Sequence, residues 1–168
     1  YHDSQQIPLW RKISMRRTAA YAATFCPVTD QLGEKMREFK MLNIKGSSVY
    51  TTVPNVVDTE MFTITSENEV VGNMVRLLHV SSLDESQKNI TGILHTLATL
   101  INSKPEFHFC AKFVGGNDSE KLRKLRTYAA SLGLTDTCVT FSGPLSSEEV
   151  DKCMQASDAL VLFSRNEN

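Results

Sequence analysis

Hydrophobic and polar positions follow two alternating patterns along the second half of the chain. Apolar runs rich in β-branched and aromatic residues occupy four short segments, 75–80, 107–114, 138–141 and 159–163, each flanked by turn residues. This composition is typical of strands. The first and last runs are continuously apolar, which indicates strands buried on both faces of a parallel sheet.

Apolar residues recur at helical spacing between these runs. The stretch that begins at Ile90 has apolar residues three and four positions apart, with Asn89 as its expected N-cap. A second stripe runs through Leu125 and closes with Gly133, at the position after a helix where glycine is favoured. A third helix opens with a capping box at 146–149. Its expected apolar face carries Val150, Cys153 and Met154.

The alternation of strands and helices predicts the fold class. Right-handed βαβ crossovers give an α/β protein with a Rossmann-like parallel sheet flanked by helices. The first 60 residues follow a different pattern, with helices expected over 10–23 and 30–39 and strands over 23–29 and 50–53. Residues 63–73 are polar and contain glycine, which favours a linker between two domains.

Composition and charge narrow the function classes. Among 168 residues, 18 Lys and Arg against 19 Asp and Glu give a net charge of −1, so the chain has no global field that attracts nucleic acid. A run of roughly 18 apolar residues, the length that spans a membrane, is absent. The four cysteines and four histidines show no metal-ligand spacing. His79 and His108 are expected to be ordinary strand residues. The chain begins without Met and stops after an apolar run, so we expect a piece of a longer protein.

Chemically active side chains follow the first predicted strand. Ser81 and Ser82 lie at the strand exit, and Lys88 lies just before the next helix. Ligands of open α/β sheets bind beyond the carboxyl ends of the strands, and a helix N-terminus attracts an anion such as phosphate. The pattern therefore indicates a candidate phosphate site, although a lysine near a helix start is more often simply solvated.

Glycines follow the next two predicted strands. Gly115 and Gly116 permit a tight turn and a close approach of the backbone to a ligand. The pair Gly143 and Pro144 could let backbone groups meet a nucleobase. Glu167 follows the last strand, where a carboxylate could accept hydrogen bonds from sugar hydroxyls. Taken singly, each of these features is equally compatible with an ordinary turn or a solvated surface residue.

The order of these features resembles the family 4 glycosyltransferases of group 1. Residues 53–62, which contain Pro-Asn-Val-Val-Asp followed by Phe, are similar to the segment that ends the family's N-terminal domain. Residues 77–97, 109–143 and 144–167 resemble three successive strand–loop–helix motifs of the C-terminal domain, and 24–32 resembles an element upstream. The resemblance covers nearly the whole chain.

The resemblance implies a GT-B fold of two Rossmann-like domains and a retaining enzyme. Such an enzyme transfers a sugar from a nucleoside-diphosphate sugar to a glycan or lipid-linked acceptor, without a cofactor or metal. Residues 1–62 would end the N-terminal, acceptor-side domain and form the crossover, 63–73 would be the linker, and 74–168 would be the incomplete first part of the donor-binding domain. The family also implies polysaccharide biosynthesis in the cytoplasm, peripheral contact of the parent with the inner membrane face, and no activity of this piece alone.

The resemblance also assigns roles to single residues. Lys88 matches the lysine that holds the donor phosphates, and Glu167 matches the first glutamate of the E-x7-E motif, which binds the donor sugar; both are the expected catalytic residues. The glycine turn after the second strand matches the turn at the cleft, and the loop after the third strand matches the one that contacts the nucleobase. The other expected donor-binding residues are Ser81, Ser82, Gly115, Gly116, Gly143, Pro144 and Leu145.

The chain departs from the family pattern in two places. Ser82 stands where the family commonly has an arginine, so one of two phosphate-holding cations is missing from its usual position. The second glutamate of the E-x7-E motif would fall beyond Asn168. A catalytically silent GT-B-like module that binds a nucleotide or glycan is therefore an alternative. A Rossmann-like interaction domain with an unrelated ligand is a third possibility, disfavoured because it gives no reason for the 54–62 segment.

Overall fold

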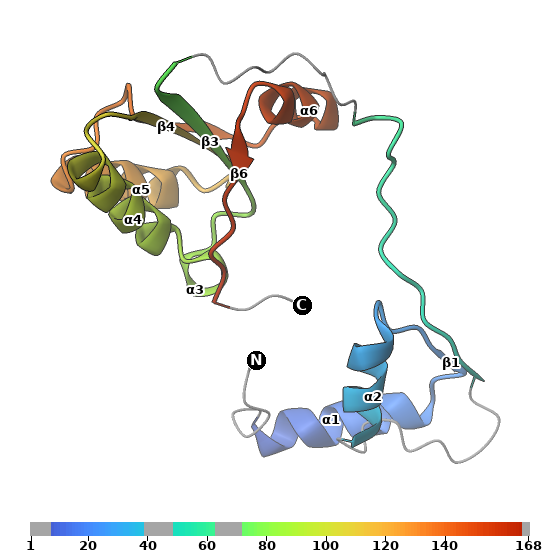
Figure 1. The fold of residues 1–168 in the computed structure, drawn as a ribbon. Helices are drawn as coiled ribbons and strands as arrows, with labels where there is room; N and C mark the ends of the chain where they lie inside the picture. The colour runs from blue at the N-terminus through green and yellow to red at the C-terminus, as the bar shows by residue number, and fades with distance from the viewer. Residues whose placement is uncertain (1–7, 39–48, 63–71, 166–168) are drawn as a thin grey trace. The chain divides into compact units, whose positions relative to one another are not determined.

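The computed structural model describes residues 8–38, 49–62 and 72–165, and it divides the chain into two compact units. The first unit is Tyr1–Val57 and the second is Asp58–Asn168 (Figure 1). Each unit has its own secondary structure and is described by itself.

The first unit combines two helices with a small parallel sheet. Its elements are α1 (Leu9–Ala20), β1 (Thr24–Phe25), α2 (Asp30–Glu38) and β2 (Val49–Tyr50), and β1 pairs with β2 in parallel. The two predicted helices are confirmed, although α1 ends before residue 23. Gly33 is the buried residue of α2 and leaves room for the ring of Tyr50, which also lies 4.0 Å from the guanidinium carbon of Arg37.

The second unit is built around a four-stranded parallel sheet in the order β5-β4-β3-β6. All three pairings in it are parallel, which confirms the predicted α/β class. The elements of this unit are β3 (Met74–Val80), α3 (Glu85–Lys88), α4 (Ile90–Ser103), β4 (His108–Val114), α5 (Ser119–Ser131), β5 (Val139–Gly143), α6 (Ser147–Gln155) and β6 (Ala159–Leu160).

Helices cover both faces of this sheet. Figure 1 shows α4 and α5 on one face and α6 on the other. The larger core lies on the α4 and α5 side, where Phe113 is fully buried and stacks on Phe141 with ring centroids 5.0 Å apart. A smaller core of Leu78, Val114 and Cys153 lies on the side of α6. Full burial of one such apolar side chain stabilises the fold by about 1.5–3 kcal/mol.

The last predicted strand is shorter than expected. Residues 159–163 were predicted to form a strand buried on both faces, whereas β6 contains only two residues, and Leu162 and Phe163 are more than half exposed. The reason lies in the topology: β6 pairs with β3 on one side, through Leu77 and Leu78, and is the outermost strand of the described sheet. The length of the apolar run therefore did not predict how many of its residues pair with the neighbouring strand.

The helix signals in the sequence are confirmed with two corrections. Ser146 and Glu149 form the predicted capping box of α6, and Gly133 follows α5 with a φ of +76°. Met154, however, is exposed instead of lying on the buried face of α6. Asn89 precedes α4 but adopts a left-handed conformation with a φ of +51°, and its side chain makes no cap hydrogen bond to the described residues of α4. Among the described residues, no helix has both the length and the apolar character needed to cross a membrane.

Candidate functional site

The exits of β3, β4 and β5 meet at one edge of the sheet, because parallel strands place their carboxyl ends together. Two backbone hydrogen bonds join these exits. The N–H of Ser81 donates to the carbonyl of Val114 at 3.1 Å, and the N–H of Gly115 donates to the carbonyl of Gly143 at 2.8 Å. The structure therefore brings Ser81, Gly115 and Gly143, three of the residues predicted from the sequence, side by side.

The glycine turn after β4 is packed tightly against the exit of β3. Gly115 has a φ of +112°, and a Cβ built on it would lie 1.8 Å from the carbonyl oxygen of Ser81. Gly116 has a φ of +66°, and its Cβ would lie 3.2 Å from the Leu83 side chain. The sequence predicted a close backbone approach to a ligand at this turn. The close approach that the structure shows is to the protein's own backbone at Ser81.

His79 and Ser81 form a buried polar network below this edge. The Nδ1 atom of His79 lies 2.8 Å from the carbonyl oxygen of Val161, and Nε2 lies 2.7 Å from Oγ of Ser81. A carbonyl only accepts, so the partners assign the proton to Nδ1, and Nε2 of the neutral ring accepts from the Ser81 hydroxyl. Oγ of Ser81 in turn accepts from the N–H of Leu83 at 3.0 Å.

This network fixes the protonation state of His79 and the role of Ser81. Burial lowers the pKa of His79 below 6.5, its hydrogen bond to Val161 opposes that shift, and the positive charge of Lys88 lowers the pKa further. The imidazole is therefore neutral at pH 7 and joins β3 to the chain that follows β6. The single hydroxyl proton of Ser81 is directed to His79 and not to an outside anion.

Lys88 ends the short helix α3, next to the exit of β3. The carboxylate of Asp84 caps this helix and accepts from the backbone N–H groups of Ser86 and Gln87 at 2.9 and 3.3 Å. Lys88 is half-buried, and its charge is close enough to influence the pKa of His79. Ser82 is exposed in the same loop. The structure thus places Ser81, Ser82 and Lys88 within one connected segment at the sheet edge.

Arg165 is a cation of this region that the sequence reasoning did not identify. Its backbone N–H donates to the carbonyl of Gln87 at 2.7 Å. Its Nη2 atom lies 2.5 Å from Oδ1 of Asn89 and 3.3 Å from Oε1 of Glu85. These contacts join residues about 80 positions apart in the chain, so no local pattern signals them. The sequence offered one general clue, that Arg165 follows a strand whose carboxyl end was expected at this edge.

Glu85 provides the cap that Asn89 was expected to supply to α4. One carboxylate oxygen of Glu85 accepts from the N–H of Thr91 at 2.9 Å, and the other accepts from the Thr91 hydroxyl at 2.5 Å. A carboxylate at this position satisfies a free N–H group and interacts favourably with the helix dipole. Glu85 can replace Asn89 because α3 ends immediately before α4 and turns this side chain toward the first turn of α4.

The remaining predicted residues are placed less closely together. Pro144 is exposed in the loop after β5, whereas Leu145 packs against the smaller core on the α6 side. Glu167 lies outside the described residues. Within the described ranges, no group of three or more His, Cys, Asp and Glu side chains is arranged to hold a metal ion. The roles of these residues toward a ligand stay predictions.

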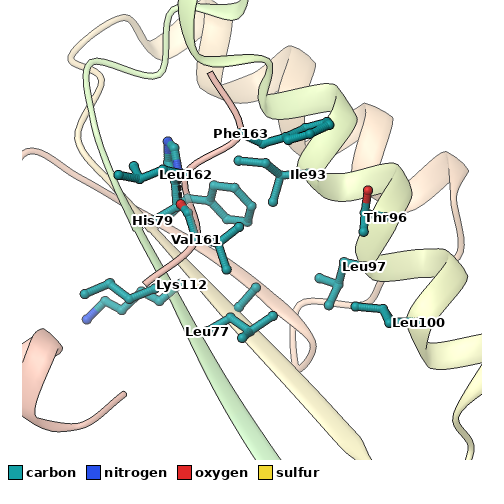
Figure 2. A pocket seen from close by; sticks show the side chains of 13 residues that line it. Leu77, His79, Ile93, Thr96, Leu97, Leu100, Lys112, Val161, Leu162 and Phe163 are labelled. Atoms are coloured by element: carbon teal, nitrogen blue, oxygen red, sulfur yellow. Dashed lines mark hydrogen bonds between the residues drawn. The ribbon is translucent and has the colours of Figure 1, made fainter. Parts of the chain in front are cut away.

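An apolar hollow of about 320 Å³ lies beside this edge, between α4 and the chain that follows β6. Figure 2 shows Leu97 and Ile93 of α4 on one side and Val161 on the other, with Phe163 beside Ile93 and the His79 hydrogen bond to Val161 next to the hollow. Its lining is mostly hydrocarbon. Because buried charge is costly without polar partners, this hollow does not suit a diphosphate.

Comparison with known proteins identifies the family of the chain. A family model described as "Glycosyl transferases group 1" matches residues 62–168, which is more than half of the sequence. The curated proteins give no match.

Several solved structures share the fold. A glycosyltransferase from Rickettsia africae ESF-5 has a TM-score of 0.63 and 17% identity, over 98% of this chain and 44% of that one. Anabaena Alr3699/HepE, in complex with UDP and glucose, has a TM-score of 0.66 and 15% identity, over 96% and 44%. A mutant of S. aureus TarM, in complex with fondaparinux, alpha-GlcNAc-glycerol and UDP, has a TM-score of 0.66 and 13% identity, over 97% and 29%.

The chain spans less than half the length of each of these structures. At such low identities the likeness concerns the fold, and it agrees with the parallel sheet flanked by helices that the second unit shows. The match of the family model extends over the whole of that sheet and its strand exits. The chain therefore belongs to the glycosyl transferases of group 1, which have the GT-B fold.

Proposed function

We propose that the chain is part of a family 4, retaining glycosyltransferase that takes its sugar from a nucleoside-diphosphate donor. The donor would bind at the edge where β3, β4 and β5 end. Residues 1–62 would close the acceptor-side domain and form the crossover, 63–73 would be the linker, and 74–168 would belong to the donor-binding domain. Activity is assigned to the parent protein, in the cytoplasm, with a glycan or lipid-linked acceptor and no metal.

One observation carries this proposal, namely the position of Lys88. It ends α3 beside the exit of β3, near enough to His79 for its charge to lower the imidazole pKa. In the transfer reaction the bond from the sugar to the diphosphate breaks, and negative charge grows on the departing phosphate oxygen. A fixed ammonium group stabilises that charge more than it stabilises the bound donor, and so lowers the barrier.

UDP is the first donor nucleotide to test, because the HepE and TarM structures contain it. We expect Lys88→Ala in the parent protein to lower kcat/KM by at least about 100-fold, the scale of losing one donor to a developing oxyanion. Lys104→Ala is a matched control, since Lys104 is 59% exposed and follows the opposite end of α4. Unchanged turnover of the Lys88 variant would remove the phosphate role.

Ser82 supports a second candidate, a GT-B-like module that binds a nucleotide or glycan without catalysis. The family commonly places an arginine at this position, and the exposed Ser82 side chain carries no charge. Calorimetry with UDP, GDP and ADP and an assay of donor hydrolysis separate the two functions. Binding with neither transfer nor hydrolysis would favour the module, and an absence of binding to all three nucleotides would contradict both.

A further inference from the structure

Arg165 contacts the residues on both sides of Lys88. Its backbone N–H bonds to the carbonyl of Gln87, which precedes the lysine, and its guanidinium bonds to the side chain of Asn89, which follows it. One residue from the exit of β6 therefore holds the chain immediately before and immediately after the expected phosphate-binding group.

The geometry of α3 makes this external support necessary. The helix contains four residues, and a single helical turn has little stability of its own because nucleation is unfavourable. It is followed at once by Asn89 in the left-handed conformation, which few L-residues adopt and which asparagine tolerates better than most. The position of Lys88 is thus set largely by contacts from outside α3, and Arg165 supplies two of them.

Arg165 also balances the charge of Glu85. The Glu85 carboxylate caps α4 and lies 3.3 Å from the Arg165 guanidinium, with side-chain exposures of 43% and 55%. If the guanidinium were removed, the carboxylate would lose its ion-pair partner, and its negative charge would remain three residues from Lys88. That charge would draw the ammonium toward itself and would repel a diphosphate.

We propose that Arg165 is a positioning residue of the donor site, which acts on the donor phosphates through Lys88. The inference rests on the proposed function, because it needs Lys88 to bind the donor. Arg165 also supplies a second positive charge, which the exposed Ser82 does not. This charge comes from the chain after β6, and it orients Lys88 instead of contacting the phosphate.

The test is a double-mutant cycle in the parent protein, with UDP titrated by calorimetry and donor kinetics measured in parallel. We expect Arg165→Ala to weaken UDP binding by about tenfold, the scale of a lost charge-assisted hydrogen bond. Both variants keep the backbone hydrogen bond to Gln87. Arg165→Lys also keeps the positive charge, so it should recover most of that loss. In a Lys88→Ala background, the same Arg165→Ala change should alter UDP binding by no more than about twofold.

The control is Arg123→Ala, because Arg123 forms a comparable ion pair with Glu120 on the exposed face of α5. Equal loss of UDP binding with and without Lys88 would overturn the proposal and would mark Arg165 as a direct phosphate ligand. Unchanged binding in Arg165→Ala, while the wild type binds UDP, would overturn it as well. A wild type that binds none of UDP, GDP and ADP would instead refute the proposed function itself.

Discussion

Gly115 is the residue whose replacement tests the sheet edge most directly. Replacement by alanine adds one methyl group at a backbone φ of +112°, where that methyl would lie 1.8 Å from the carbonyl oxygen of Ser81. Real Cβ atoms essentially never lie within 3.0 Å of such an atom, so the two backbones must separate by about 1.2 Å. The groups that must move are rigid, because Ser81 is bonded to Val114 and Gly115 to Gly143.

The expected cost has two parts. An L-residue at positive φ costs about 1–2 kcal/mol relative to glycine, and forcing a group into a packed site costs about 1–3 kcal/mol more. Gly115→Ala should therefore lower the free energy of unfolding by about 3 kcal/mol. Gly133 separates the two parts, because its φ is +76° and no described atom lies within 4 Å of its Cβ position. Gly133→Ala should cost about 1–2 kcal/mol, from the backbone alone.

The assay is urea-induced unfolding of the whole chain, followed by circular dichroism, for wild type and both variants. The midpoint of Gly115→Ala should lie clearly below that of Gly133→Ala, at a similar slope. If the two variants differ by less than about 0.5 kcal/mol, a size at which surface effects are common, the turn after β4 is not packed against Ser81. That result would refute the close packing of the joined strand exits.

Two further predictions concern the network and the caps. The folded state keeps His79 neutral to a lower pH than the unfolded chain does, so stability should fall as the pH drops below 6.5, with a limiting slope of about 1.4 kcal/mol per pH unit. Between pH 7.5 and 5.5, His79→Gln should remove this contribution to the pH dependence of the free energy of unfolding. The control His95→Gln, on the exposed face of α4, should not remove it. If the free energy of unfolding of wild type and His79→Gln changed in parallel with pH, the burial of His79 would not be the cause. Ser146→Ala breaks the capping box of α6 and should cost about 1 kcal/mol in urea unfolding. The neighbouring Ser147→Ala is its control, and equal effects would mean that the cap contributes nothing.

The sequence predicted the elements of the second unit because its hydrophobic periods are regular. The period through Leu125 and the glycine at Gly133 mark the length of α5, and the pair Ser146 and Glu149 marks the start of α6. These signals are local: each depends on residues within four positions of one another, and local hydrogen bonding and backbone conformation decide them. The parallel sheet then follows from the alternation of strands and helices.

The features that the sequence did not predict depend on contacts between distant segments. The length of β6 is set by its pairing with Leu77 and Leu78, and the cap of α4 comes from Glu85 because α3 turns that carboxylate toward Thr91. The contacts of Arg165 join the exit of β6 to α3 across about 80 residues. The periodicity of hydrophobic residues contains no information on such pairings. The rule that ligands bind beyond the carboxyl ends of parallel strands therefore predicted the edge of the sheet, but not the side chains that hold it together.

Two kinds of contact lie at this edge: hydrogen bonds that hold the strand exits together, and charged side chains that we propose act on the donor. Backbone hydrogen bonds join the exits of β3, β4 and β5, and the buried imidazole of His79 joins β3 to the chain that follows β6; all of these groups are satisfied without a ligand. The charged groups, Lys88 and Arg165, lie instead on α3 and after β6, where the side chains are partly exposed. A change in the joined exits should therefore reduce stability first, whereas a change at Arg165 should reduce donor affinity at nearly constant stability. Stability and donor affinity should both be measured for Gly115→Ala and Arg165→Ala. If the two variants lose the same amounts of both, the strand exits and the charged groups behave as one unit and not as two separate parts of the site.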